Sequence, residues 1–252
     1  MAFVVCIVPV SPMRKESNHK AEMVSQLLFG EMAEVLEEGN VFIKIKCLYD
    51  GYEGWCQSNQ ITQIDDSEAI RSKKILTSKW ISVIELNGSP MKLPLGCSLD
   101  RLTGEKIGKY TLHYLDNGWD VSNIIYSWEA IHSFCLQYLN TPYLWGGRSV
   151  FGIDCSGFVQ QVFAYFNKKL PRDAYEQARE GEVVGFLQEV KGGELAFFDN
   201  EEGHINHVGI LMDTETIIHA SGKVRIDKID NMGIVNSETG VRTHMLRIIK
   251  RI

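Results

Sequence analysis

The sequence predicts an α+β protein in which two small β-barrels precede a domain of helices packed on an antiparallel sheet. Residues 1–122 consist of short runs of β-forming residues separated by turn signals, which is typical of small barrels. Apolar residues then recur at helical spacing in 123–139 and again in 155–166. The remaining residues return to strand-like runs, and helices followed by strands indicate an α+β domain.

The chain divides into three predicted domains. The first barrel covers residues 1–66, where Asp50-Gly51 is a turn signal between short strands. Residues 67–122 repeat this style and form the second barrel. Residues 123–252 contain both predicted helices and the later strands.

Polar residues mark the predicted helix starts. Ser122 or Asn123 is suited to cap the first helix. Asp154 is placed to cap the second, because an Asp side chain accepts hydrogen bonds from the first free N–H groups of a helix. Cys155 then falls in the first helical turn.

Composition excludes several classes of protein. Hydrophobic residues make up 44% and charged residues 23% of the chain, which is ordinary globular composition. The net charge of −6 includes no basic block, so nucleic acid is not an expected partner. No apolar stretch is long enough to span a bilayer, and we expect no membrane partner. The apolar run at 2–8 lacks a preceding positive charge and meets Pro9, so we read it as a strand rather than a signal peptide and expect a cytoplasmic protein.

The chain has six cysteines, at positions 6, 47, 56, 97, 135 and 155, and no CxxC pair. We expect free buried thiols and no zinc site. His204 and His207 resemble half of a metal site, but no matching pair lies nearby in the sequence. We therefore expect neither a metal nor an organic cofactor.

Three residues are candidates for chemistry: Cys155, His207 and His219. A helix N-terminus stabilises a thiolate through its free N–H groups and dipole. A general base must reach the sulfur, and a third group must orient that base. His207 opens one predicted strand and His219 lies in the next.

The hairpin between these strands supplies a geometric test. The two histidines share a face of the sheet only if the connecting loop has an odd number of residues. Residues 213–215 offer a three-residue loop, which places His219 beside Gly209 and diagonal to His207. The residues alone leave catalysis and a structural role both open, since a cysteine that opens an amphipathic helix is commonly a buried hydrophobe.

The order of motifs resembles a known family. PYLWGG at 142–147 and DCSGFV at 154–159 resemble the nucleophile region of NlpC-type cell-wall peptidases. GEL at 193–195, HVGI at 207–210 and IHA at 218–220 follow in the family's order. The resemblance covers about residues 123–252.

This resemblance implies a papain-like catalytic domain. Cys155 matches the nucleophile, His207 the base and His219 the polar residue that orients the base. Tyr143 matches a tyrosine whose hydroxyl, with the Cys155 backbone N–H, helps to hold the oxyanion.

The first barrel carries its own resemblance. SPMR at 11–14, QLLFGE at 26–31 and DGYEGW at 50–55 resemble the bacterial SH3-like domain of an NlpC subgroup, and we expect both barrels to be SH3-like. Members of that subgroup resemble γ-D-glutamyl-L-diamino acid endopeptidases, which release L-Ala-D-Glu from murein peptides. Their SH3-like domain narrows the cleft, where a tyrosine and acidic groups bind the free amine of L-Ala.

The resemblance also implies the substrate-binding residues. The expected set is Tyr52, Asp173, Asp154, Ser156, Arg172 and Glu22. Tyr52 matches the tyrosine and Asp173 the acidic residue that faces the amine, and an ammonium group that leaves water needs anionic partners. A small hydroxyl residue often follows the Arg-Asp pair in the subgroup, where this chain has Ala174.

The expected function is hydrolysis of free murein-derived peptides, as in cell-wall peptide recycling. One alternative is an exported wall-remodelling hydrolase or amidase that accepts blocked stem peptides. A second is a non-catalytic wall-binding module with an inert thiol, and a third is a transacylase that uses the same residues. The sequence leaves open which diamino acid is accepted and the oligomeric state.

Overall fold

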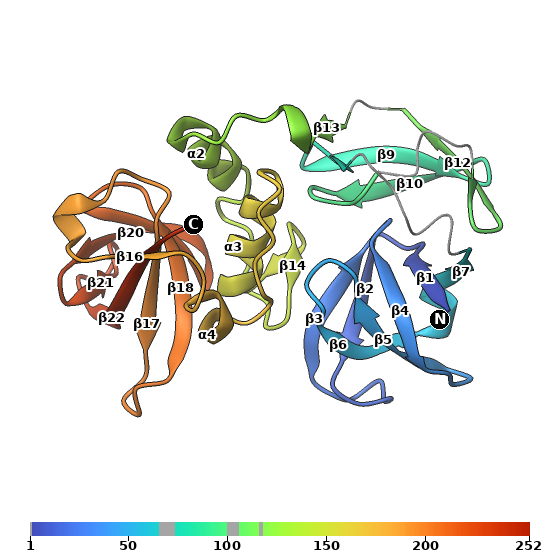
Figure 1. Ribbon diagram of the computed structural model, residues 1–252, viewed down its shortest axis with the longest axis horizontal. Helices are drawn as coiled ribbons and strands as arrows, with labels where there is room; N and C mark the ends of the chain where they lie inside the picture. Colours follow the sequence, from blue (N-terminus) through green and yellow to red (C-terminus); the bar gives the residue numbers. More distant parts are fainter. Residues whose placement is uncertain (1, 66–73, 100–105, 116–117) are drawn as a thin grey trace. The chain divides into compact units, whose positions relative to one another are not determined.

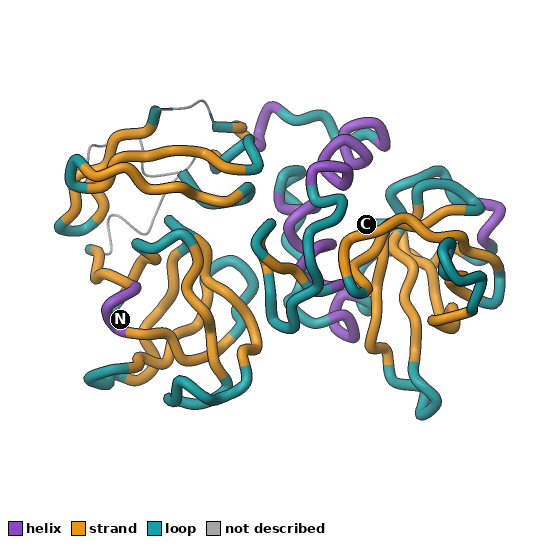
Figure 2. The backbone as a smooth tube through the Cα atoms, turned by 180° about the vertical axis from the view of Figure 1, so that it is seen from behind, coloured by secondary structure: helices purple, strands orange, loops and turns teal. Residues whose placement is uncertain are grey.

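The computed structural model describes residues 2–65, 74–99, 106–115 and 118–252. The chain forms two compact units (Figures 1 and 2). The N-terminal unit consists of residues 1–124 together with 145–150. The C-terminal unit consists of residues 125–144 and 151–252.

A seven-stranded antiparallel sheet builds the first part of the N-terminal unit, in the order β3-β2-β6-β5-β4-β1-β7. Its strands are β1 (Phe3–Cys6), β2 (Val10–Arg14), β3 (Met23–Leu28), β4 (Met32–Glu37), β5 (Phe42–Cys47), β6 (Glu53–Gln57) and β7 (Ile61–Ile64). The strands curl into the predicted barrel (Figure 1), around a core that includes Met13, Leu27 and Ile45. The predicted turn at Asp50-Gly51 joins β5 to β6, and Gly51 takes a φ of 76° that suits glycine.

A second sheet completes this unit. It has the order β10-β9-β12-β11. Its strands are β9 (Ile81–Leu86), β10 (Ser89–Pro94), β11 (Lys106–Ile107) and β12 (Tyr110–Tyr114), and β8 (Ile75–Leu76) pairs separately with β13 (Trp119–Asp120). Leu28 and Phe29 of the first barrel share one buried cluster with Ile84, Leu93 and Leu112. The two sheets therefore share a hydrophobic core.

Arg148 ties a distant piece of sequence to the N-terminal unit. Its guanidinium donates to both carboxylate oxygens of Glu31, at 2.8 and 3.0 Å, and to the carbonyl oxygen of Gln26 at 2.7 Å. Its backbone N–H donates to the Gln26 side chain at 2.7 Å. The Arg148 side chain is 2% exposed, so this charge depends on those partners. The segment 145–150, which contains β14 (Arg148–Ser149), is thereby held by the barrel.

The C-terminal unit is built on a second seven-stranded antiparallel sheet, in the order β16-β22-β17-β18-β19-β20-β21. Its strands are β16 (Glu182–Val184), β17 (Leu195–Asp199), β18 (Ile205–Leu211), β19 (Thr216–Ser221), β20 (Lys223–Asp230), β21 (Gly233–Val235) and β22 (Arg242–Arg251). The sheet is antiparallel, as predicted. It differs from a simple open sheet because β21 also pairs with β22, so β22, β17, β18, β19, β20 and β21 form a closed circuit.

Three α-helices accompany this sheet: α2 (Trp128–Gln137), α3 (Cys155–Ala164) and α4 (Ala174–Gln177). Helix α3 packs on β18 and β19, and α4 packs on β18. Every residue of α3 is buried, because the helix also contacts α2 and α4. The short strand β15 (Gly152–Ile153) precedes α3.

The start of the first helix corrects a sequence prediction. Helix α2 begins at Trp128, and its N-cap is Ser127, whose hydroxyl accepts from the Ala130 N–H at 3.3 Å. Ser122 and Asn123 lie instead in a short 3-10 turn, where the Asp120 carboxylate accepts from the Ser122 N–H at 3.0 Å. Neither Ser122 nor Asn123 therefore caps the first helix, because both belong to a 3-10 turn that Asp120 caps.

All six cysteines are free and buried, as predicted. Within the described residues, the longest helices are too short or too polar to cross a membrane.

The buried Arg148–Glu31 pair leads to a stability prediction. We expect Arg148→Met to lower the free energy of unfolding by about 3–5 kcal/mol, because Glu31, whose side chain is only 12% exposed, then keeps its charge without its main partner. The measurement is urea denaturation of the full chain. Lys44→Met is the matched control, since Lys44 and Glu53 form a surface pair at 3.1 Å and its loss costs about 1 kcal/mol or less. Equal effects of the two substitutions would contradict the assigned role of Arg148.

Candidate active site

The N-terminus of α3 positions Cys155. Asp154 is the N-cap, as predicted, and its Oδ1 accepts from the Gly157 N–H at 2.7 Å. Cys155 is the first residue of the helix and is 6% exposed. Burial raises the pKa of its thiol, and the backbone N–H groups of Val208 and Ser156 act against that rise. The nucleophile candidate therefore lies where α3 meets β18.

A buried ion pair holds the start of α3. The Arg172 guanidinium donates to both Asp154 oxygens, at 3.0 and 2.5 Å, and to the Ser156 hydroxyl at 2.9 Å. Gln177 donates to the Ser156 carbonyl at 3.0 Å. Asp154, Ser156 and Arg172 were expected to bind substrate, and the structure shows them bonded to one another beside Cys155.

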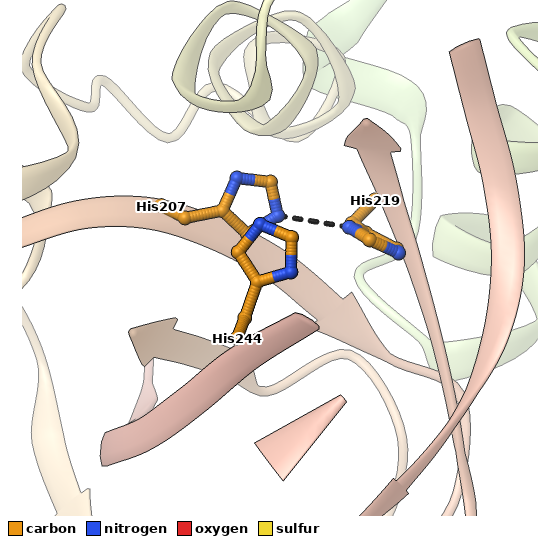
Figure 3. Close-up of side chains that lie close together, drawn as sticks. All are labelled: His207, His219 and His244. Carbon is orange, nitrogen blue, oxygen red and sulfur yellow. Dashed lines mark hydrogen bonds between the residues drawn. The ribbon is translucent and has the colours of Figure 1, made fainter. Parts of the chain in front are cut away.

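The β18–β19 hairpin has the register predicted from loop parity. Gly209 pairs with His219, and the Met212 N–H donates to the Thr216 carbonyl at 2.9 Å, which leaves residues 213–215 as the loop. His219 thus lies diagonal to His207 on the same face. The two rings meet, with His207 Nε2 at 2.8 Å from His219 Nδ1 (Figure 3). A Cβ on Gly209 would lie 2.8 Å from the His219 Cβ, so this close approach requires glycine.

The hydrogen-bonded series continues to Asp227 on β20. His219 Nε2 lies 3.0 Å from Asp227 Oδ2. Arg225 donates to both Asp227 oxygens, at 2.8 and 3.0 Å, and the Ser237 N–H donates at 2.8 Å. Burial opposes the charge of Asp227, but hydrogen bonds from His219, Arg225 and Ser237 hold its pKa well below the usual range.

The charge on Asp227 assigns the protons of both histidines. A carboxylate only accepts, so His219 carries its proton on Nε2 and offers a lone pair at Nδ1. His207 then donates from Nε2, which leaves the lone pair of its Nδ1 free to act as a base. The series therefore gives His207 the tautomer that a general base needs.

Tyr143 also belongs to this site. Burial raises its pKa, and negative charge on Cys155 and Asp154 would raise it further. Its hydroxyl therefore stays protonated. The Tyr143 backbone forms a parallel bridge with Ile153, two residues before Cys155. Its backbone is held by a hydrogen bond from its N–H to the Gly222 carbonyl at 2.9 Å. This position is consistent with the predicted role as an oxyanion donor.

The pKa of Cys155 differs from the expectation that the helix N-terminus stabilises a thiolate. Burial, and then the charge of Asp154, raise the pKa of Cys155 to about 12, although the backbone N–H groups of Val208 and Ser156 lower it. Burial, followed by the charges of His219 and His244, lowers the pKa of His207. The helix terminus is present as predicted, but burial outweighs it. The resting pair is therefore a thiol and a neutral imidazole.

Two residues of the site were missed by sequence reasoning. Asp227 could have been found by applying hairpin parity again, because His219 pairs with Arg225 on β20, which places Asp227 diagonal to it. His244 on β22 stacks on His207, with ring centroids 4.1 Å apart and an interplanar angle of 25°. Burial lowers its pKa to about 4. No short motif contains His244, so only the tertiary fold identifies it.

The other residues expected to bind substrate are Asp173, Tyr52 and Glu22. Asp173 is the half-buried residue before α4, which packs on α3 and β18. Tyr52 and Glu22 belong to the N-terminal unit. Tyr52 packs partly buried against the barrel core. Glu22 is more exposed and accepts from the Trp145 indole N–H at 2.8 Å.

The raised pKa of Cys155 leads to a prediction about its reactivity. Because the thiolate is the reactive form, we expect alkylation of Cys155 by iodoacetamide to accelerate steadily from about pH 5 to about pH 9. The measurement is mass spectrometry of the Cys155 peptide, with Cys155→Ala to confirm the labelled site. A rate that is already at its maximum below about pH 6 would contradict a neutral resting pair.

Two segments of the chain match known protein families. Residues 140–243 match the NlpC/P60 family, and residues 13–61 match the bacterial dipeptidyl-peptidase SH3 domain. The chain is 45% identical over 85 residues to a γ-D-glutamyl-L-lysine dipeptidyl-peptidase of Bacillus subtilis, a match that covers 33% of this chain and 28% of that relative. A Bacillus cereus protein of the same name is 24% identical over 89% of this chain and 76% of its own length.

A solved structure extends the likeness to the whole fold. The crystal structure of an NlpC/P60 family protein from Bacillus cereus has a TM-score of 0.80, with 18% identity, and the match covers 99% of each chain. The sequence matches show that the chain carries a domain of the NlpC/P60 cysteine peptidase family at residues 140–243 and a bacterial dipeptidyl-peptidase SH3 domain at residues 13–61.

Proposed function

We propose that this chain is an endopeptidase that hydrolyses the bond between γ-D-Glu and an L-diamino acid in murein-derived peptides with a free N-terminal L-Ala. The observation that carries the proposal is the ordered series His207–His219–Asp227 beside Cys155. The similarity to relatives named γ-D-glutamyl-L-lysine dipeptidyl-peptidase supports the substrate class. A role in peptide recycling follows if free peptides are the substrates.

The proposed reaction begins with proton transfer from Cys155. His207 Nδ1 takes the proton of the thiol as the sulfur attacks the γ-carbonyl carbon of D-Glu. His219 and Asp227 hold the ring in the required tautomer and stabilise the positive charge that forms on it. A cysteine on a helix N-terminus beside a histidine on a sheet also supports the proposed papain-like relationship.

The tetrahedral intermediate then needs donors for its oxyanion. The Tyr143 hydroxyl and the Cys155 backbone N–H are the proposed donors. The C–N bond breaks as His207 returns the proton to the leaving amine, which leaves a thioester on Cys155. Water, deprotonated by His207, attacks the thioester, releases L-Ala-D-Glu and restores the thiol.

Recognition of the free amine is proposed to fall on Tyr52 and Asp173, with Glu22 as a further carboxylate. Both oxygens of Asp154 are already bonded to Arg172, which makes Asp173 the better candidate for an ammonium partner. Ala174 supplies no hydroxyl, so recognition here relies on charge.

The substrate proposal predicts a strong preference for an unblocked peptide. We expect L-Ala-γ-D-Glu-diamino acid to be cleaved with a kcat/KM at least about 10²-fold above that of its N-acetylated form, because the blocked peptide leaves the anionic partners unpaired. Mass spectrometry of the products, with lysine and diaminopimelate tripeptides, makes the measurement.

Variants make this test specific. Cys155→Ala should form no product. Asp173→Asn should reduce the ratio of kcat/KM between the free and the N-acetylated peptide. Glu201→Gln changes an exposed carboxylate elsewhere on the same unit and should leave this ratio unchanged. Equal rates on both peptides in the unaltered chain would favour the blocked-stem hydrolase instead.

Gly209 supplies a second test, of the histidine pair. We expect Gly209→Ala to lower kcat by about 10²-fold, because the added methyl group would displace His219 from His207 and a misplacement of about 1 Å has that cost. The measurement is steady-state hydrolysis of the preferred tripeptide. Gly185→Ala is the control, since the nearest atom to its Cβ would be a Glu189 carboxylate oxygen at 3.6 Å. Similar kinetics for both variants would show that the close approach is not required.

A further inference from the structure

Three histidines from separate strands converge at the candidate active site. His207 lies on β18, His219 on β19 and His244 on β22 (Figure 3). Each offers one ring nitrogen, and these three atoms lie within 4.8 Å of one another. His207 and His219 are buried and His244 is partly buried. The hydrogen-bonded series described above uses two of these rings and does not use His244.

The hydrogen bonds around the rings decide which nitrogens converge. His207 Nε2 and His219 Nδ1 face each other at 2.8 Å. His244 Nδ1 lies 2.9 Å from the Thr243 hydroxyl, which leaves His244 Nε2 as its free atom. In Figure 3 a nitrogen of His244 lies beside the dashed line that joins the other two rings. The third ring therefore completes a small cluster of imidazole nitrogens.

The surroundings of the cluster resemble those of metal-binding histidines. A metal-ligating histidine commonly donates its second N–H to a carboxylate, which fixes the ring and raises its basicity. His219 has this arrangement with Asp227 at 3.0 Å, and Asp227 is held in turn by Arg225. Three imidazole ligands with an open fourth position suit Zn²⁺.

We propose that His207, His219 and His244 bind a divalent zinc ion, and that the bound ion inhibits the peptidase. The inhibitory part rests on the proposed function, whereas the binding part does not. Zinc–nitrogen bonds of about 2.1 Å place two ligands about 3.4 Å apart. The His207 and His219 nitrogens must therefore separate by roughly half an ångström, and the His244 nitrogen must approach them.

The inhibition follows from the protons of His207. When zinc takes the lone pair at Nε2, the proton there moves to Nδ1, so that the ring stays neutral. No lone pair then remains for the proton of the Cys155 thiol, and the hydrogen bond to His219 is lost. His219 keeps its proton on Nε2 toward Asp227, and no proton is released overall. The ion thus blocks the base without needing the thiol as a ligand.

Calorimetry on the full chain tests the binding part. In Cys155→Ala we expect one zinc ion per chain on titration with ZnCl₂. The affinity should fall at least about tenfold when His244→Gln or His244→Phe is added; the phenylalanine keeps a stacked ring but no ligand. His204→Gln is the matched control, since His204 is exposed and outside the cluster, and it should bind zinc normally. No binding by Cys155→Ala, or equal affinity with and without His244, would overturn the site.

Kinetics test the inhibitory part separately. With Cys155 present, we expect zinc to inhibit tripeptide hydrolysis and EDTA to reverse it. Each variant is compared with its own zinc-free rate, and the zinc concentration for half-inhibition should rise at least about tenfold in His244→Gln but not in His204→Gln. Equal inhibition of both variants would mean that zinc acts through Cys155 and would overturn the proposal. If no tripeptide is hydrolysed, the proposed function fails while calorimetry still decides the metal site.

Discussion

The Asp154 carboxylate holds together the part of the molecule on which the chemistry depends. It caps α3 through the Gly157 N–H and forms a bidentate pair with Arg172. Arg172 also bonds the Ser156 hydroxyl, so both neighbours of Cys155 in the chain are fixed. Burial of the thiol, and then the same negative charge, raise the pKa of Cys155. Asp154 thus fixes the position of the sulfur and adds to the effect that burial has on its protonation.

A second set of contacts controls the base. Arg225 keeps Asp227 charged, Asp227 fixes the proton of His219, and His219 fixes that of His207. Each step depends on the one before, because a neutral imidazole has one donor and one acceptor. Burial lowers the pKa of His207, which keeps its lone pair available. The base is therefore prepared by burial, which keeps its ring neutral, and by hydrogen bonds that lead from His207 to the charged Asp227.

Local patterns in the sequence predicted part of this site well. The cap at Asp154 and the hairpin register that places His219 beside Gly209 follow from side-chain chemistry and strand periodicity, and the structure confirms both. The predicted cap of the first helix was wrong because Asp120 forms a tighter local turn. The stacked ring of His244 could not be predicted, since it depends on strands far apart in the sequence. The pKa of Cys155 likewise depends on burial by the whole unit.

The segment that Arg148 anchors has a consequence for how such a chain can be recombined. The chain passes between its two units three times, after residues 124, 144 and 150. A single recombination crossover near residue 124 would therefore join the peptidase part of one protein to the barrel of another. The hybrid would take Arg148 from the parent that supplies the peptidase part, and positions 26 and 31 from the parent that supplies the barrel. Modular exchange of the SH3 domain is thus constrained by one buried charge, and the partners of that charge must be inherited together.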